Sequence, residues 1–357
     1  MAPSLVTWPT RKTGIPVTTT LMGLGAFPET DPLSLRMLGM HGNVAANRAV
    51  TACDLLVSVG ARFDDRVTGK ISEFAPNAVI AHIDIDPSTI SKSVAIDIPV
   101  VGDVKLVLKD LIEQVSRVDC AEWLAQTAAW REEFKFDFNR KTRELLPQFV
   151  IEKVYELTKG EAIITTDVGQ HQMWAAHFFK YTQPRTFISS GGLGTMGFGL
   201  PAAIGVQIGR PDKTVVCLSG DGSIQMNFQE LVVAVEHKLP VKVVILNNGN
   251  LGMVRQWQGM FYKNEYSASG LGQTGRAANE QIKGRSDVYL PDFVKLAEAH
   301  GAVGLRATTH DEAVHAIQKA LAMAGPVVIE CIVSPDENVY PMVPPGASLT
   351  EMIHSMA

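Results

Sequence analysis

The feature that most constrains the fold is a series of short, continuous apolar runs in the second half of the chain. Each run is rich in Val, Ile and Leu, and most end in Gly, Asp or Asn: EAIITTDVG, RTFISSGG, TVVCLSGDG, VKVVILNN and GPVVIECIV. Strands that are apolar at successive positions are buried on both faces, as in parallel sheets covered by helices. Ligands bind such sheets at the carboxyl ends of the strands. We therefore expect an α/β domain whose chemistry lies in the residues that close these runs.

A similar alternation occupies the first part of the chain. The runs IPVTT, DLLVSVG and AVIAHIDID alternate with helix-like stretches, one around residues 45–52 and one after Gly102-Asp103. This pattern predicts another parallel sheet with helices on its faces. Residues 119–147 differ, because Trp, Glu, Lys, Arg and Phe recur there with helical spacing. We predict two doubly wound parallel-sheet domains, at 1–118 and at 148–357 with a C-terminal tail, joined by a helical linker at 119–147.

Charge and cysteine usage narrow the range of partners and compartments. The 32 basic and 37 acidic residues give a net charge of -5 and form no basic block, so nucleic acid is not an expected partner. No segment reaches the roughly 18 apolar residues of a membrane span, so we expect no membrane partner either. Neither a disulfide framework nor a zinc site is predicted, because the cysteines are widely spaced. We expect the cytoplasm, with an organelle as the less favoured alternative. The cysteines are Cys53, Cys120, Cys217 and Cys331.

Two successive runs in the second half end in oxygen-bearing residues at a fixed spacing. TVVCLSG is closed by Asp221-Gly222-Ser223, and VKVVIL is closed by Asn247-Asn248, with a helix expected between them near residues 228–237. If these strands are neighbours, the Asp221 carboxylate and the Asn248 amide oxygen meet at one sheet edge. Such oxygens suit Mg²⁺, which leaves its other positions to phosphates and water. Gly222 permits close approach of the backbone, while Ser223 and the helix start offer donors to a diphosphate.

Two other interpretations of these residues have to be weighed. A lone Asp-Gly-Ser is usually a plain turn, but its combination with Asn-Asn at this spacing matches the thiamine diphosphate motif of enzymes that convert 2-oxoacids. Gly192-Leu-Gly194-Thr-Met-Gly197 also fits G-x-G-x-x-G, with Asp221 at the next strand end, so dinucleotide binding is an alternative. A ribose-binding carboxylate does not need the following Gly-Ser or the Asn-Asn. With thiamine diphosphate bound, Met196 would press between the two cofactor rings; the alternative is an ordinary core methionine.

Longer stretches resemble acetohydroxyacid synthase, also called acetolactate synthase. In the second half they are SGGLGTMGFGLPAAIG (190–205), SGDGSIQMNFQEL (219–231), LNNGNLGMVRQWQ (246–258) and PMVPPGASLTEMI (341–353). In the first half MLGMHG (37–42), VGARFDDRVTGKI (59–71) and HIDIDPSTI (82–90) resemble the FAD-binding middle domain of that family. The resemblance runs from about residue 14 to the C-terminus.

The resemblance implies roles for particular residues around thiamine diphosphate. Asp221, Asn248 and the main-chain carbonyl of Asn250 would bind Mg²⁺. Trp257 matches the residue that favours 2-oxobutyrate as second substrate, although a core or interface aromatic is the alternative. The diphosphate and thiazolium would be bordered by Val168, Gly169, Gln170, His171, Gly194, Met196, Gly220, Gly222 and Ser223. The reaction cavity would be lined by Met226, Met253 and Val254, and the catalytic residues would be Met196, Met226, Met253 and Trp257.

The first half would hold FAD through residues that match the family's flavin positions. Asp65 and Arg66 match residues near the substrate channel, although a solvated loop whose charges pair with one another is the alternative. The flavin positions are Leu38, Gly39, Met40, His41, Gly42, Gly60, Ala61, Arg62, Asp84, Ile85, Gly102 and Asp103.

The resemblance implies a catalytic subunit, or a fragment of one, for branched-chain amino-acid biosynthesis. It would decarboxylate pyruvate and condense it with a second pyruvate or 2-oxobutyrate, as a homo-oligomer or beside a full-length catalytic subunit, with a regulatory small subunit. In the family, the glutamate that activates the cofactor lies in an N-terminal pyrimidine-binding domain, and no counterpart precedes GIPVTTT. We therefore expect that domain to be absent, turnover to be poor, and FAD to bind weakly or not at all. The alternatives are a non-catalytic cofactor-binding remnant that needs a partner chain, and another thiamine-dependent 2-oxoacid decarboxylase.

Overall fold

The computed structural model describes residues 7–271 and 290–355. Two compact units divide this part of the chain. The first unit contains the residues up to Asp137, together with Tyr181–Pro184 and the chain from Tyr340 onward; the second unit contains Phe138–Lys180 and Arg185–Val339. The sequence also predicts a connection longer than the family's usual one at residues 263–290. Residues 272–289 of that connection lie outside the described residues.

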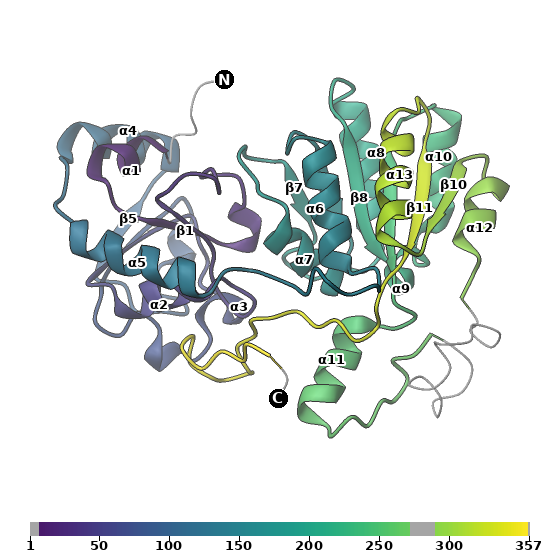
Figure 1. Ribbon diagram of the computed structural model, residues 1–357. Coiled ribbons are helices and arrows are strands. Elements are labelled where there is room, and N and C mark those ends of the chain that lie inside the picture. Colours follow the sequence, from purple (N-terminus) through teal and green to yellow (C-terminus); the bar gives the residue numbers. More distant parts are fainter. Residues whose placement is uncertain (1–6, 272–289, 356–357) are drawn as a thin grey trace. The chain divides into compact units, whose positions relative to one another are not determined.

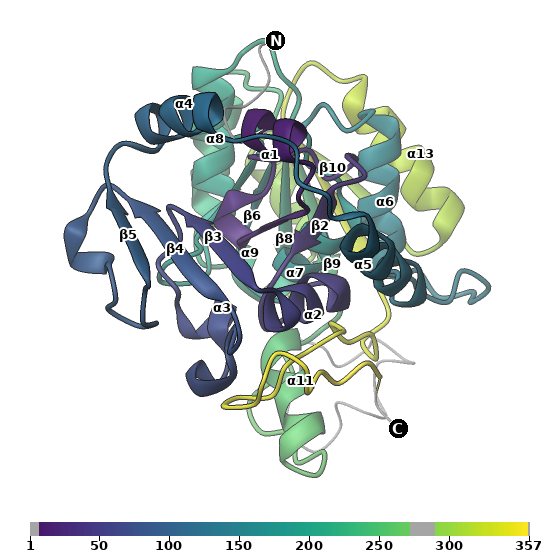
Figure 2. The same ribbon diagram turned by 90° about the vertical axis from the view of Figure 1, so that its left-hand side faces the viewer.

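The second unit is built on a six-stranded parallel sheet (Figures 1 and 2). The strand order is β10-β11-β9-β8-β6-β7. Five of these strands coincide with the apolar runs predicted from the sequence, which confirms a parallel sheet with helices in this half. The strands are β6 (Ile163–Thr166), β7 (Phe187–Ser189), β8 (Val215–Gly220), β9 (Lys242–Asn247), β10 (Val303–Ala307) and β11 (Val327–Ile332).

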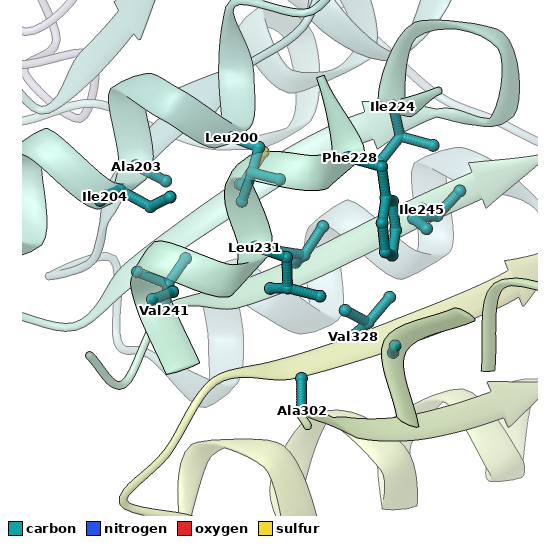
Figure 3. Packing of buried hydrophobic residues seen from close by; sticks show 14 of the residues in the cluster. Leu200, Ala203, Ile204, Ile224, Phe228, Leu231, Val241, Ile245, Ala302 and Val328 are labelled. Atoms are coloured by element: carbon teal, nitrogen blue, oxygen red, sulfur yellow. The ribbon is translucent and has the colours of Figure 1, made fainter. Parts of the chain in front are cut away.

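Helices α8, α10 and α12 bury their apolar side chains against this sheet. Figure 3 shows Leu200 and Ile204 of α8 and Leu231 of α10 in one buried cluster with the strand residues Ile245 and Val328. Each such side chain contributes roughly 1.5–3 kcal/mol when it is fully removed from water. The helices of this unit are α6 (Pro147–Leu157), α7 (Gln170–Phe178), α8 (Gly199–Gly209), α9 (Asp221–Ile224), α10 (Leu231–Glu236), α11 (Gly252–Phe261), α12 (Phe293–Ala299) and α13 (His310–Leu321), with a 3₁₀ turn η4 (Phe228–Glu230).

The first unit contains two smaller parallel sheets, β1-β2 and β3-β4-β5. Figure 2 shows the strands of the second of these sheets side by side. One face of β3-β4-β5 leaves apolar side chains exposed: Leu55, Val57, Val79 and Ile98 are 38–53% accessible. Parallel sheets are normally covered on both faces, so this face is unusual. The elements are β1 (Val17–Thr19), β2 (Ser34–Met37), β3 (Leu55–Val59), β4 (Val79–Asp84), β5 (Ile98–Val101), α1 (Thr7–Thr13), α2 (Val44–Ala52), α3 (Asp65–Thr68), α4 (Val104–Gln114) and α5 (Ala121–Glu133), with 3₁₀ turns at Leu21–Gly23, Ile71–Glu73 and Pro87–Thr89.

The limits of the two units differ from the predicted boundaries. Helix α5, predicted as part of a linker, belongs to the first unit, because Trp123 and Trp130 pack on its core. The C-terminal tail also belongs to the first unit, since Leu349 and Met352 are buried in that same core. Contacts between residues so distant in sequence leave no periodic signal. None of the helices in the described ranges is both long and apolar enough to cross a membrane.

Candidate active site

The candidate site lies at the carboxyl ends of three neighbouring strands of the second unit. Strand β8 pairs with β6 on one side and with β9 on the other. The chain leaves these strands at Thr166, Gly220 and Asn247. The order in which the chain adds strands reverses here, because β7 is added on one side of β6, whereas β8, β9 and β11 are added on the other side. Such a point is where open α/β sheets bind ligands.

Asp221 is the buried carboxylate of this site. It begins α9 directly after β8 and is 1% exposed. Its Oδ1 accepts from the Gly222 amide at 3.0 Å, and its Oδ2 accepts from the Gly249 amide at 2.7 Å. Burial raises the pKa of Asp221 from 3.8 to about 7, against the opposing effect of the backbone donors. Without a cation, the backbone donors therefore offset only part of the cost of burying the Asp221 charge.

Asn248 and Asn250 bring further oxygen atoms to the same place. Asn248 Oδ1 accepts from the Asn250 amide at 3.0 Å, and Asn250 Nδ2 donates to the Asn248 carbonyl at 2.7 Å. Asn250 Oδ1 is buried and has no hydrogen-bond partner within the described structure. An undercompensated carboxylate beside buried amide oxygens fits a hard divalent cation such as Mg²⁺.

No cluster of three or more His, Cys, Asp or Glu side chains suited to a metal occurs among residues 7–271 and 290–355. A cation beside Asp221 would therefore draw its remaining ligands from amide and carbonyl oxygens, water or a phosphate. This is the usual pattern for Mg²⁺ at phosphate sites. The donor set consequently fits a cation that arrives with a diphosphate.

A pocket that is partly open to solvent lies over this anchor, and it spans about 510 Å³ when the adjoining open solvent is included. Most of the predicted thiamine-site residues line it; Gly194, Met226 and Trp257 do not. The sequence interpretation missed Trp174, Leu246, Leu251 and Gly252, although each lies within four residues of a predicted site residue. The predicted residues that line the cavity are Val168, Gly169, Gln170, His171, Met196, Gly220, Asp221, Gly222, Ser223, Asn248, Asn250, Met253 and Val254.

His171 gives the cavity a buried polar group near the strand ends. It is 6% exposed, and its Nε2 has no hydrogen-bond partner in the described part of the chain. A Cβ added to Gly220 would come within 2.9 Å of the ring, so the ring lies directly against β8. Burial lowers the pKa of His171 to about 4. The imidazole is therefore neutral at pH 7.

The three predicted residues outside the cavity lining have other surroundings. Met226 is 53% exposed, just after α9. Trp257 lies on α11, where its ring meets Phe261 edge-on at 5.5 Å. Gly194 has a φ of +66° and lies in the loop between β7 and α8, near Val168. Their predicted roles stay predictions.

The residues predicted to bind flavin lie at strand ends of the first unit. Gly60, Asp84 and Gly102 follow or close β3, β4 and β5, and the Gly102 amide donates to the Asp84 carbonyl at 2.9 Å. Asp103 caps α4, and Ile85 is 67% exposed. The structure thus brings the residues after β3, β4 and β5 to one edge. The remaining predicted residues, Leu38, Gly39, Met40, His41 and Gly42, follow β2 of the other sheet, and Ala61 and Arg62 follow Gly60.

Several of these groups already have partners. The side chain of Asn47 accepts from the Gly39 amide at 2.8 Å and donates to the Gly39 carbonyl at 2.9 Å. Arg62 forms an ion pair with Asp64 at 2.9 Å, and Asp64 caps α3, which begins at Asp65. Arg66, the other residue matched to the substrate channel, lies in α3 as well. The turn after β2 is therefore fixed by hydrogen bonds within the first unit.

Comparison with known families defines the class of protein. Residues 6–111 match the model "Thiamine pyrophosphate enzyme, central domain", and residues 167–331 match "Thiamine pyrophosphate enzyme, C-terminal TPP binding domain". The chain therefore carries the central and C-terminal domains of thiamine pyrophosphate enzymes. The second match includes Gly192, Gly197 and Asp221, so it accounts for the G-x-G-x-x-G pattern without a dinucleotide site.

Over nearly its whole length the chain is homologous to acetolactate synthase large subunits, which confirms the resemblance seen in its motifs. "Acetolactate synthase large subunit" of Buchnera aphidicola subsp. Schizaphis graminum (strain Sg) is 44% identical over 348 residues, 96% of this chain and 58% of that protein. "Acetolactate synthase isozyme 3 large subunit" of Escherichia coli (strain K12) is 45% identical, covering 95% and 58%. "Acetolactate synthase 1, chloroplastic" of Zea mays is 48% identical, covering 96% and 53%. The chain thus spans little more than half the length of these curated relatives.

Proposed function

We propose that this chain carries out acetolactate synthase chemistry as a catalytic subunit or part of one. Its substrates would be pyruvate and a second 2-oxoacid, pyruvate or 2-oxobutyrate, in branched-chain amino-acid biosynthesis. The observation that carries the proposal is the buried Asp221 carboxylate beside Asn248 and Asn250, under a cavity lined by apolar side chains. The homology to acetolactate synthase large subunits supports the same reaction.

Asp221, Asn248 and Asn250 would hold Mg²⁺, which in turn would hold the diphosphate of the cofactor. Thiamine diphosphate, when bound, supplies the electron sink that decarboxylation of a 2-oxoacid requires. Met196, Met253 and Val254 would keep water away from the reacting atoms, because they belong to the apolar part of the lining. His171 would meet the diphosphate as a neutral ring with one nitrogen free for a hydrogen bond.

The acid that activates the cofactor would come from outside this cavity lining. Among the described lining residues Asp221 is the one carboxylate, and the cation would occupy it. A positioned acid or base contributes roughly 10² to 10⁴ in rate, so turnover would depend on a partner that supplies one. We propose a full-length catalytic subunit as that partner, with a second copy of this chain and a regulatory small subunit as further partners. The exposed apolar face of β3-β4-β5 supports association of this kind.

FAD would bind weakly to the first unit. The predicted flavin residues lie at strand ends of two different sheets, and Ile85 is 67% exposed, so little of a large ligand would be buried there. The proposed compartment is the cytoplasm, since all four cysteines are free thiols. An organelle is the alternative compartment, because the Zea mays relative is named as chloroplastic.

The proposal is tested by an acetoin assay on the purified chain with pyruvate, thiamine diphosphate and Mg²⁺. The assay is run with and without a separately supplied pyrimidine-binding domain. Activity that appears only with the added domain is the expected result. Activity of the chain alone at the level of intact relatives would refute the dependence on an external acid. No activity in either case, with cofactor binding retained, would favour the second candidate, a non-catalytic cofactor-binding module.

A further inference from the structure

We propose that two buried glutamines, Gln256 and Gln170, fix which atom of the Asn248 side chain faces the cation. We call Gln256, Gln170 and Asn248 the amide relay. The relay begins at the backbone of Val339, after β11, and ends at the metal anchor after β9. The inference rests on the proposed function in one respect, namely that Asn248 binds a cation.

The orientation of the relay is set at its far end by the backbone of Val339. Gln256 Oε1 accepts from the Val339 amide at 2.8 Å, and Gln256 Nε2 donates to the Val339 carbonyl at 3.0 Å. A backbone N–H only donates and a carbonyl only accepts, so turning the Gln256 amide over would break both bonds. Gln256 is 2% exposed, and water cannot readily replace them.

The orientation of the Gln256 amide determines the orientation of the Gln170 amide, which in turn contacts Asn248. Gln170 Nε2 donates to Gln256 Oε1 at 2.9 Å and to the Glu337 carbonyl at 3.2 Å. Both partners are acceptors, so the Gln170 amide nitrogen must face them. Its Oε1 therefore faces the other way, where it accepts from Asn248 Nδ2 at 3.3 Å.

The consequence for Asn248 is that its nitrogen is directed toward the relay and its oxygen toward the anchor. Oδ1 accepts from the Asn250 amide at 3.0 Å and keeps a second lone pair. The two ends of an amide have nearly the same shape, so packing alone selects neither. A turned amide would present an N–H₂ group, which Mg²⁺ does not bind. The Asn250 amide, which only donates, favours this orientation at one end of the side chain, and the hydrogen-bond polarity of the relay enforces the same orientation at the other end.

Gly252 leaves the space in which Gln170 and Asn248 meet. A Cβ at Gly252 would lie 2.0 Å from Gln170 Oε1 and 2.8 Å from Asn248 Nδ2. Any other residue would push the two side chains apart. Gln256 itself does not line the cavity, so it acts on a cation only through Gln170 and is a positioning residue.

The test is a double-mutant cycle on the full chain, read as Mg²⁺ affinity by calorimetry in saturating thiamine diphosphate. Gln256→Met removes the relay polarity with little change in volume. Loss of a group that orients a metal ligand typically costs about 10- to 100-fold in affinity, and we expect at least about tenfold here. In an Asn248→Asp background both side-chain atoms are oxygens, so orientation no longer matters. There Gln256→Met should change the affinity by less than about twofold, or raise it, because Gln170 becomes free to donate to Asp.

A purely structural role for Gln256 would lower the affinity equally in both backgrounds, and that result would overturn the relay. In its protonated form, Gln256→Glu keeps an acceptor oxygen toward Gln170 and a donor toward the Val339 carbonyl, so it should retain most of the affinity. A loss with Gln256→Glu as large as with Gln256→Met would also overturn the relay, and this variant serves where Gln256→Met does not fold. Gln318→Met, on the exposed side of α13, is the matched control and should change nothing. Absence of Mg²⁺ binding in the unsubstituted chain would refute the metal assignment, whereas equal losses would refute the relay alone.

Discussion

Replacing the buried Asp221 by asparagine should stabilise the metal-free chain and abolish its response to Mg²⁺. The Asp221 carboxylate is 1% exposed, and burial raises its pKa to about 7. Asparagine is uncharged and has nearly the shape of the protonated acid, but its one oxygen can accept only one of the two backbone hydrogen bonds that Asp221 receives. The cost of the lost bond does not vary with pH, so the stability difference between the two chains should change with pH only where Asp221 ionises.

The size and sign of the effect follow from proton linkage. The folded-state pKa of Asp221 lies above its ordinary value of 3.8, so the folded chain holds a proton that the unfolded chain has lost. Stability from this group is present at low pH, falls as the pH rises above 3.8, and is fully lost above about 7. At about 1.4 kcal/mol per pH unit, the loss amounts to about 4 kcal/mol in all, of which about 3 kcal/mol falls between pH 5 and pH 8. Asp221→Asn avoids this loss.

Urea unfolding of both chains in EDTA at pH 5 and pH 8 measures the difference. We expect Asp221→Asn to gain about 3 kcal/mol relative to the unsubstituted chain over this interval. Asp311→Asn, at an exposed position on α13, is the matched control and should show no such gain. A parallel pH dependence for Asp221→Asn and the unsubstituted chain would refute the buried, undercompensated carboxylate.

The same pair of chains tests the cation. Mg²⁺ with thiamine diphosphate should raise the urea midpoint of the unsubstituted chain at pH 8, because a ligand that binds only the folded state stabilises it. The response should weaken below pH 7, where protons compete for Asp221. Asp221→Asn should show no Mg²⁺ response at either pH. An equal response in both chains would exclude Asp221 as a ligand.

Three further predictions concern other parts of the chain. Gly252→Ala should destabilise the fold by about 1–3 kcal/mol and weaken Mg²⁺ binding, since its Cβ would lie 2.0 Å from Gln170 Oε1, whereas Gly325→Ala, with open space around it, should do neither. Trp257→Leu should change the ratio of products from 2-oxobutyrate and pyruvate in an assay complemented with a pyrimidine-binding domain; an unchanged ratio would favour a packing role against Phe261. Asn43→Ala should cost about 1 kcal/mol in thermal unfolding, because its side chain caps α2 at the Ala45 amide.

The strand ends of the second unit could be predicted from the sequence because several local signals agree there. Continuous Val and Ile runs end at Asp221 and at Asn248, and a polar residue after a buried strand has few structural reasons to be present. Strand β10 was not predicted, since Val303–Ala307 contains a glycine and an arginine and lacks the continuous apolar character of its neighbours. The position of the C-terminal tail was also beyond local patterns, because Met352 meets its core partners across some three hundred residues of sequence.

The amide relay shows a second kind of information that a single sequence does not carry. Gln170 and Gln256 each lie in a helix and are chemically unremarkable side chains, and nothing in their local pattern relates one to the other. Their significance depends on donor and acceptor directions across three separate segments. Sequence spacing identifies which groups reach a sheet edge, but the polarity with which they arrive is a property of the tertiary structure.

The relay also connects the anchor to the wall of the cavity. Gln256 lies on α11 three residues after Met253, and residues at that spacing lie on neighbouring turns of one helix face. The hydrogen bonds from Gln256 to the Val339 backbone therefore also restrict the position of Met253, which lines the cavity. By reciprocity, a cation that favours one orientation of Asn248 also favours the position of α11 in which Gln256 and Gln170 are paired. Under this proposal, filling the anchor and shaping the cavity wall are parts of one equilibrium.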